Sequence, residues 1–273
     1  MVAGELKSGE NKSVTFQCSD GTNMDAYLSR PSDLATPRPA IIVIHEAWGL
    51  NEQIMGVTRR YSQEGSLVAI APNLFTRHSD ILTEKNIAGA MKVMRSIPND
   101  KRNDPAAIQR LMENISETDR KVMAFFFSGR EAFEKVMAND LISCIHYLEN
   151  LEFVVKERIG VIGFCLGGGL AYQLSTMFPC SATVAFYGSN PKPLEAVANI
   201  SGPVLGIYAG EDERINSGIP AIVESMIKYK KTFEMKLYKG VQHAFFTETM
   251  PTYDKSAAED AWYKSLSFFN RYL

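Results

Sequence analysis

The chain reads GFCLGGG at residues 163–169, directly after the apolar run 159–163 and at the start of a helical pattern that extends to residue 177. The first five letters have the form G-x-C-x-G, the cysteine form of the nucleophile elbow, a sharp turn between a strand and a helix. The backbone at such a turn leaves no room for side chains two residues before and after its centre, so glycine is needed there. The stretch therefore predicts a strand, a strained turn at Cys165 and a helix.

Cys165 has two interpretations. In the first it is a nucleophile, because the turn places its sulfur near a helix N-terminus, where the helix dipole favours the thiolate. The backbone amide of Leu166 would then point at the oxyanion that develops during the reaction. In the second, Cys165 is an inert buried cysteine in a glycine-rich turn, since buried free cysteines are common.

The remaining chain alternates between strand and helix patterns. Short apolar, β-branched runs predict strands buried on both faces of a sheet, at 40–44, 67–71, 159–163, 182–186 and 204–208. An edge strand is expected at 233–237, and an N-terminal hairpin at 13–18 and 24–29 around an Asp-Gly turn signal. Helical patterns cover 53–64, 131–150, 169–177, 219–230 and 256–272. This alternation predicts the α/β class, with a mostly parallel central sheet and helices on both faces.

Residues 79–129 depart from this alternation, because no convincing strand lies between Ser79 and Gly129. Their helical patterns are at 84–95, 105–114 and 117–127. The segment could be a decoration on one edge of the sheet or a cap over a pocket. We expect a single domain, residues 1–273, with a helical insertion at about 79–129.

Composition excludes several classes of protein. The net charge is −2 without a block of like charge, so nucleic acid is not an expected partner. No stretch is long and apolar enough for a membrane span, and the N-terminus lacks a signal-peptide core, so we expect a cytoplasmic protein without membrane contact. The histidines and cysteines lack metal-binding spacing, and neither a metal nor a cofactor is expected. Packing roles are expected for Cys18, Cys144, Cys180 and His146.

Two further polar residues follow predicted strands. Asp212 comes after the strand at 204–208 and is preferred over its neighbours Glu211 and Glu213 as the carboxylate that orients a histidine. His243 comes after the last strand, where a general base is expected. The order nucleophile, acid, histidine is that of α/β-hydrolases, and it predicts attack by Cys165 on an ester carbonyl and a thioester intermediate.

The first buried strand ends in HEAWG at residues 45–49. In α/β-hydrolases this loop supplies the second oxyanion-binding amide, here that of Ala47. Glu46 would stand at the mouth of the site, where its negative charge would oppose thiolate formation and favour a protonated thiol. The alternative for Glu46 is a solvated loop carboxylate.

Four motifs in this order resemble the dienelactone hydrolase family: HEAWG at 45–49, GFCLGG at 163–168, GED at 210–212 and HAF at 243–245. The segment APNLFTR at 71–77 is similar to the family's stretch after the second central strand. The resemblance covers most of the chain apart from the helical insertion.

The resemblance implies an α/β-hydrolase fold and a small lactone substrate with a pendant carboxylate, hydrolysed by Cys165, Asp212 and His243. It also implies that Glu46 interacts with the resting thiol and swings away when substrate arrives. Arg77 matches an arginine that contacts the substrate carboxylate, a role that suits bidentate guanidinium–carboxylate pairing.

The sequence departs from the family in two ways. No arginine follows the catalytic histidine within 244–248, although Arg214 near Asp212 could substitute, and the insertion is longer than in compact members. A more apolar ester or lactone is therefore also possible, because aromatic residues are expected in loops near the site: Trp48, Phe75, Phe245 and Phe246. Trp48 is included among the expected substrate contacts.

The leading hypothesis is a cysteine-dependent hydrolase of lactones or related esters, with a small-molecule substrate. The alternatives are a general carboxylesterase or thioesterase, and a non-catalytic protein that uses Cys165 as a redox-sensing thiol. The set of Cys165, Asp212 and His243 argues against the second alternative, because binding alone would not need the third member. The oligomeric state is not predicted.

Overall fold

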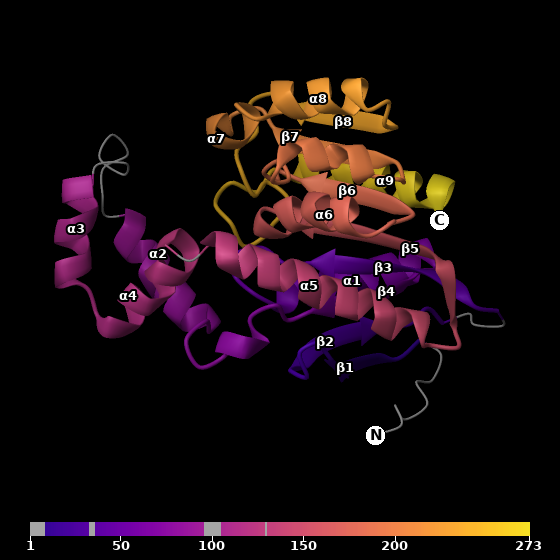
Figure 1. The fold of residues 1–273 in the computed structure, drawn as a ribbon, viewed down its shortest axis with the longest axis horizontal. Helices are drawn as coiled ribbons and strands as arrows, with labels where there is room; N and C mark the ends of the chain where they lie inside the picture. The colour runs from indigo at the N-terminus through magenta and orange to yellow at the C-terminus, as the bar shows by residue number, and fades with distance from the viewer. Residues whose placement is uncertain (1–8, 33–35, 96–104, 129) are drawn as a thin grey trace.

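The computed structural model describes residues 9–32, 36–95, 105–128 and 130–273. These residues form one sheet of eight strands in the order β1-β2-β4-β3-β5-β6-β7-β8 (Figure 1). The strands are β1 Asn11–Gln17, β2 Asn23–Ser29, β3 Arg38–Ile44, β4 Val68–Pro72, β5 Val154–Phe164, β6 Ala182–Phe186, β7 Val204–Ala209 and β8 Phe233–Tyr238. The strands from β4 to β8 in this order are parallel, whereas β2 runs antiparallel to both β1 and β4. The predicted hairpin and the mostly parallel sheet are confirmed.

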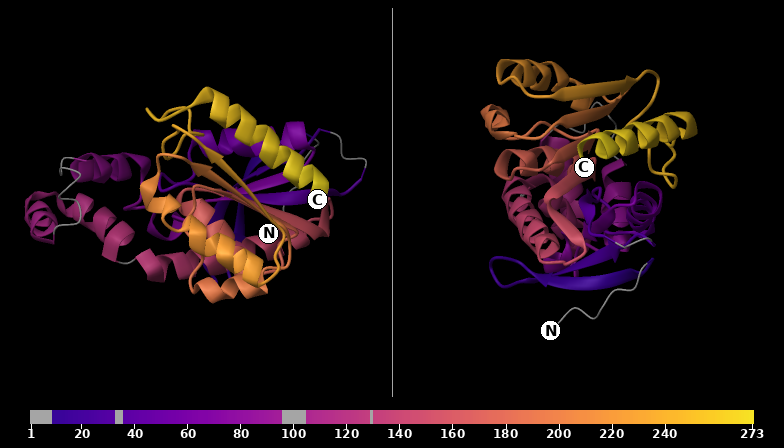
Figure 2. Two further views of the ribbon diagram at one scale, coloured as in Figure 1. Left: turned by 90° about the horizontal axis from the view of Figure 1, so that it is seen from above. Right: turned by 90° about the vertical axis from the view of Figure 1, so that its right-hand side faces the viewer.

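Helices cover both faces of the sheet, as predicted (Figure 2). On one face lie α1 Glu52–Gly65 and α9 Lys255–Tyr272. On the other lie α5 Arg130–Glu149, α6 Leu166–Met177 and α8 Ile219–Lys228. A short helix, α7 Glu213–Asn216, follows β7. Because the crossovers place helices on both sides, the central strands need apolar residues at successive positions rather than at alternate ones.

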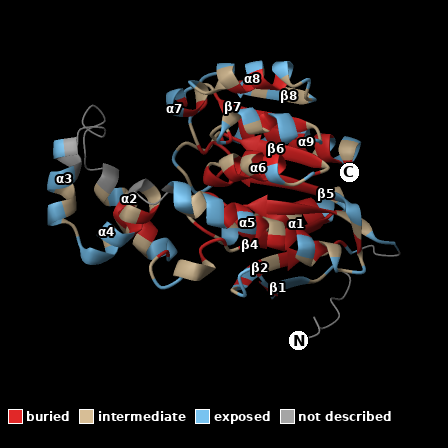
Figure 3. Ribbon diagram, viewed as in Figure 1, coloured by how far each residue is buried: buried red, intermediate tan, exposed pale blue. Residues whose placement is uncertain are grey.

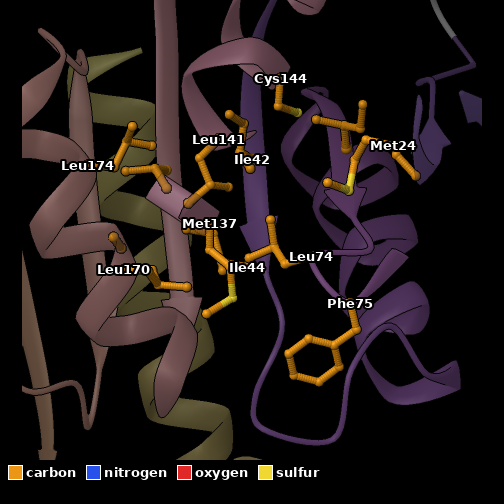
Figure 4. Close-up of a cluster of buried hydrophobic side chains, with 14 of the residues drawn as sticks. Met24, Ile42, Ile44, Leu74, Phe75, Met137, Leu141, Cys144, Leu170 and Leu174 are labelled. Carbon is orange, nitrogen blue, oxygen red and sulfur yellow. The ribbon is translucent and has the colours of Figure 1, made fainter. Parts of the chain in front are cut away.

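The strand β3 illustrates this requirement. Ile42 and Ile44 pack in the cluster beneath α5 and α6, whereas Ile41 and Val43 pack in the cluster beneath α1 and α9. All four side chains are fully buried. Figure 3 shows that burial concentrates along the central strands, and Figure 4 shows Ile42 and Ile44 among Leu141, Leu170 and Leu174 of the helical layer.

The insertion forms α2 Glu84–Arg95, α3 Pro105–Asn114 and α4 Glu117–Met123, followed by a π-helical turn, Ala124–Ser128. These helices match the predicted ones, except that the last pattern divides into α4 and the π-helical turn. Gly129, the predicted end of the insertion, lies outside the described residues. Figure 1 shows α2, α3 and α4 to one side of the sheet. Ile87 and Ala90 of α2 and Val122 and Met123 of α4 belong to the same buried cluster as Ile42 and Ile44.

The structure also bears on the remaining cysteines, on His146 and on membrane-spanning helices. Cys18, Cys144 and Cys180 are buried, as expected of packing residues. The prediction for His146 is wrong, because its side chain is 59% exposed and pairs with Glu149 on the outer side of α5. No helix among the described residues is long and apolar enough to cross a membrane.

Candidate active site

The carboxyl ends of the parallel strands bring three predicted residues together. Cys165 directly follows β5, Asp212 follows β7, and His243 lies in the loop after β8. His243 Nε2 is 3.0 Å from Cys165 Sγ, and His243 Nδ1 is hydrogen-bonded to a carboxylate oxygen of Asp212. The sulfur, the imidazole and the carboxylate therefore form one chain of contacts from elements far apart in sequence.

Cys165 lies on a turn that only glycine neighbours permit. Its φ of 54° is in the left-handed region, which is uncommon for a residue with a side chain. A Cβ on Gly163 would lie 1.9 Å from the carbonyl oxygen of Gly167, and a Cβ on Gly167 would lie 2.3 Å from the carbonyl oxygen of Ile44. The crowding predicted for the elbow is thus present, and it sets Cys165 at the N-terminus of α6.

Asp212 is oriented by the short helix that it begins. One carboxylate oxygen accepts a hydrogen bond from the amide of Ile215 at 3.4 Å, and the other contacts His243. Glu211 and Glu213 are exposed, and Glu211 instead accepts a hydrogen bond from the amide of Gly240. Asp212 is therefore the residue of this acidic run that faces the histidine.

The neighbours of His243 favour its charged form. Burial of the ring disfavours the charged form, but the sulfur of Cys165 and the carboxylate of Asp212 outweigh it and raise the pKa of His243 to about 10. The ring of Tyr187 packs against the imidazole with centroids 4.8 Å apart. An imidazolium beside Sγ is the arrangement that favours a nucleophilic thiolate.

Glu46 is buried beside this group rather than solvated. Its carboxylate accepts hydrogen bonds from the hydroxyl of Tyr187 at 3.1 Å and from that of Thr247 at 2.9 Å. Burial raises the pKa of Glu46 above its ordinary value, although these two hydrogen bonds and nearby His243 oppose the rise. The interpretation as a solvated loop carboxylate is wrong, and the contact with the resting thiol stays a prediction.

His45 fixes the loop that carries Glu46. The amide of Leu74 donates to His45 Nε2 at 3.1 Å, so the ring proton is on Nδ1, which donates to the carbonyl of Glu46 at 2.7 Å. Complete burial lowers the pKa of His45 to about 4, and the ring is neutral. This histidine therefore joins the loops after β3 and β4.

A pocket of about 60 Å³ opens at the sulfur. Ala47 and Leu166, the predicted oxyanion residues, both line it. As the first residue of α6, Leu166 has no acceptor for its amide within the helix, so this N–H is available to a ligand. Apolar residues from the end of the insertion and from α5 also line it: Phe125, Phe126, Phe133 and Met137.

A model of the dienelactone hydrolase family matches residues 24–273. The chain belongs to this family. A relative from Saccharolobus solfataricus is 44% identical over 256 residues, covering 94% of this chain and 97% of that protein. One from Escherichia coli is 28% identical over 265 residues, covering 93% and 84%. Both carry the name "Putative carboxymethylenebutenolidase".

Solved structures agree in fold with this dienelactone hydrolase family member. A dienelactone hydrolase-like promiscuous phosphotriesterase from metagenomic libraries has a TM-score of 0.71 at 19% identity, covering 97% of this chain and 99% of that one. The dienelactone hydrolase from Anabaena variabilis has a TM-score of 0.62 at 13% identity, covering 97% and 98%. The predicted α/β-hydrolase fold is confirmed, and as a member of the family the protein is a hydrolase of carboxylic ester bonds.

Arg77 lies away from the pocket at Cys165. Its guanidinium pairs with Asp140 at 2.6 Å and with Asp20 at 2.7 Å, and these carboxylates raise its pKa further above its ordinary value. It lines a separate cavity of about 230 Å³, and Phe125, Phe133 and Met137 line both cavities. The role of Arg77 as a substrate contact stays a prediction. Its positive charge is already paired with the carboxylates of Asp20 and Asp140.

The expected aromatic contacts are placed differently. Phe75, Phe245 and Phe246 are buried in the core, and Trp48 is half-buried against the α5 and α6 side of the core and is not part of the lining of the Cys165 pocket. The rings of Phe75 and Phe245 nevertheless lie next to the site, since Phe75 packs against Phe125 and Phe126 of the pocket lining and Phe245 packs against Tyr187. The role of Trp48 as a substrate contact stays a prediction.

Several residues of the site have no counterpart in the sequence interpretation. Tyr187 and Thr247 hold Glu46, and Ser189 lines the Cys165 pocket. Tyr187 and Ser189 directly follow a buried strand, and the carboxyl ends of parallel strands share one edge of a sheet, so their position was a usable signal. Within the described residues, no group of three or more His, Cys, Asp or Glu side chains is arranged to hold a metal ion.

Proposed function

We propose that this dienelactone hydrolase family member cleaves esters and lactones with Cys165 as nucleophile, His243 as acid and base, and Asp212 as the group that orients His243. The observation that carries the proposal is the continuous contact from Cys165 Sγ to His243 Nε2, and from His243 Nδ1 to the Asp212 carboxylate. The names of the relatives favour a lactone among the substrates.

In the first half of the reaction the sulfur of Cys165 attacks the ester carbonyl carbon. A carbon–sulfur bond forms, the carbonyl π electrons move to oxygen, and the proton of the thiol is held on His243. The tetrahedral intermediate then collapses, its carbon–oxygen bond breaks, and His243 gives the proton to the departing alkoxide. The product is an alcohol and a thioester on Cys165; from a lactone, both remain one molecule.

In the second half water attacks the thioester. His243 takes a proton from the water, the carbon–sulfur bond breaks, and the thiolate returns to its place beside the imidazolium. Asp212 accepts a hydrogen bond from His243 Nδ1 and so orients the ring, so that Nε2 faces the sulfur.

Two amides would stabilise the oxyanion that forms in each half. Leu166 at the start of α6 and Ala47 after β3 both line the pocket at Cys165. Two amides that bind one oxyanion must both face the same pocket, and these two residues meet that requirement. The close approach of Gly167 to the carbonyl of Ile44 holds these two loops against each other. Losing one such donor typically costs about 10²–10³-fold in rate.

Kinetics of Cys165→Ala and Cys165→Ser test this proposal. With p-nitrophenyl butyrate and with a dienelactone, we expect kcat/KM to fall by at least about 10⁴-fold in both variants, because loss of the nucleophile removes the covalent route. Cys180→Ala is the matched control, since Cys180 is a buried cysteine outside the site, and it should retain activity.

Two results would reject the proposal. Turnover that survives Cys165→Ala would show that another group reacts with the substrate. A wild-type protein that alkylates readily at Cys165 with iodoacetamide but hydrolyses neither compound would instead favour a redox-sensing thiol.

A further inference from the structure

The sheet ends on a strand with an uncovered apolar edge. β8 is the last strand of the sheet, at the end away from β1, and no strand in the described part of the chain pairs with its outer side (Figure 1). Met235 and Leu237 of β8 are 46% and 47% exposed, and Ile227 of α8, the helix that precedes β8 in the chain, is 72% exposed. An exposed apolar edge strand is a place where another strand can pair.

The backbone of β8 defines which residues would take part in such a pairing. The amide of Gly210 donates to the carbonyl of Tyr238 at 2.7 Å, so the backbone groups of Tyr238 face β7. Successive residues of a strand direct their backbone groups to opposite sides. The amides and carbonyls of Phe233, Met235 and Leu237 therefore face outward, where they could form an antiparallel ladder with a second strand.

The side chains of β8 alternate between an apolar and a charged face of the strand. Phe233 packs in the buried cluster beneath α8, so the apolar side chains at alternate positions share the α8 face. On the other face Glu234 pairs with Arg271 of α9 at 2.6 Å, and its side chain remains 38% exposed. Lys236 lies on this face as well, two positions further along. The charged face thus carries a negative and a positive group side by side.

This arrangement makes the strand complementary to itself. When two antiparallel copies are centred on Met235, Glu234 of each copy lies opposite Lys236 of the other, and Phe233 lies opposite Leu237. Centring the pair on Glu234 or on Lys236 would instead place that charged residue opposite its own copy, and like charges directly opposite each other are destabilising. The register centred on Met235 also pairs all three residues whose backbone groups face outward.

We propose that two copies of this chain form a dimer by antiparallel pairing of β8 with β8, with the two-fold axis at Met235. The two sheets then continue into each other across the axis. A contact between identical surfaces about a two-fold axis is closed, so it produces a dimer and no filament. No residue of β8 or α8 lines the pocket at Cys165, so substitutions in β8 test the association separately from catalysis.

The association can be measured by light scattering during size-exclusion chromatography over a series of protein concentrations. The wild type should have twice the mass of the chain at high concentration. Met235→Lys places an ammonium group opposite its own copy at the axis, and we expect the dissociation constant of the dimer to rise by at least about tenfold. Met177→Lys is the matched control, since Met177 is 41% exposed at the end of α6, and it should leave the constant unchanged.

Charge reversal tests the register. Glu234→Lys and Lys236→Glu should each weaken self-association, because each places like charges opposite one another. A mixture of these two variants should form the heterodimer, and a variant with both substitutions should dimerise like the wild type. Native mass spectrometry distinguishes these species. Because Glu234→Lys also removes the ion pair with Arg271, circular dichroism and thermal unfolding must show that each variant is folded.

Three results would overturn the proposal. A wild type that stays monomeric at every concentration has no such interface. A dimer that Met235→Lys weakens no more than Met177→Lys does is formed by another surface. Folded charge variants that self-associate like the wild type, or that form no heterodimer when mixed, contradict the register centred on Met235.

Discussion

The pocket at Cys165 has two walls that are built in different ways. The backbone wall consists of strand ends and tight turns, where backbone packs on backbone through Gly163, Gly167 and their neighbours. The aromatic wall consists of side chains from the π-helical turn and α5 whose rings pack against one another. The ring centroids of Phe125 and Phe133, for example, are 3.8 Å apart. The first wall holds the reacting groups, and the second limits the size of what they can reach.

This difference indicates how each wall tolerates change. Backbone contacts at about van der Waals distance cannot yield without moving a strand, so the first wall should be sensitive to a single added methyl group. Aromatic side chains can be shortened while the helices that carry them remain, so the second wall should respond with altered substrate preference. Each wall therefore has its own diagnostic substitution.

The largest effect is expected for Gly167→Ala in the backbone wall. The added Cβ would lie 2.3 Å from the carbonyl oxygen of Ile44 and must displace the loop that carries Glu46 and Ala47. We expect the free energy of unfolding to fall by at least about 3 kcal/mol, and kcat/KM to fall by more than about a hundredfold. Urea denaturation and ester hydrolysis measure the two quantities.

Gly56→Ala is the matched control for this substitution. A Cβ on Gly56 would meet only Arg59 Nη2, at 3.7 Å, and the residue lies inside α1. The variant should be more stable by about 1 kcal/mol and equally active, because alanine favours a helix interior. If Gly167→Ala were as stable and active as the wild type, the backbone wall would have room for an added methyl group and would not be rigid.

A smaller effect is expected for Phe126→Ala in the aromatic wall. Phe126 is half-buried and lines the pocket at Cys165 but not the cavity at Arg77, so its truncation enlarges the pocket alone. We expect the ratio of kcat/KM for p-nitrophenyl octanoate to that for the acetate to rise about tenfold, since each buried CH₂ contributes about 0.8 kcal/mol.

The control for the aromatic wall is Phe178→Ala. Phe178 is also half-buried but lies at the C-terminal end of α6, beside His146. The same loss of ring volume at Phe178 should leave the octanoate-to-acetate ratio of kcat/KM unchanged. A chain-length preference that moved equally in both variants would mean that Phe126 does not limit the pocket.

The central strands and the tight turn around Cys165 can be predicted from the sequence. Apolar β-branched runs such as 40–44 are buried on both faces, and that requirement marks a central parallel strand clearly. The glycines around Cys165 likewise report a local crowding that depends on few neighbours. Chain order then placed Asp212 and His243 at neighbouring strand ends, where the structure brings them into contact.

The other contacts of the site cannot be predicted from the sequence, because they join side chains that come together only when the helices pack. Tyr187 and Thr247 are separated from Glu46 by 141 and 201 positions, and no local pattern connects them. For Arg77 the motif identified a cationic residue, but Asp140 of α5 pairs with it, and the sequence contains no sign of that pairing. The prediction of a packing role for His146 is wrong because its sequence neighbours on α5 are apolar, whereas its own side of the helix is exposed.

The most direct test of the account is the chemical identity of the acyl-enzyme. Wild-type protein mixed with p-nitrophenyl butyrate would be quenched in acid during turnover, digested, and analysed by mass spectrometry. We predict a butyryl group on the peptide that contains Cys165, as a thioester released by neutral hydroxylamine and absent from Cys165→Ala. A butyryl group on another residue, or turnover without any acylated peptide, would contradict it.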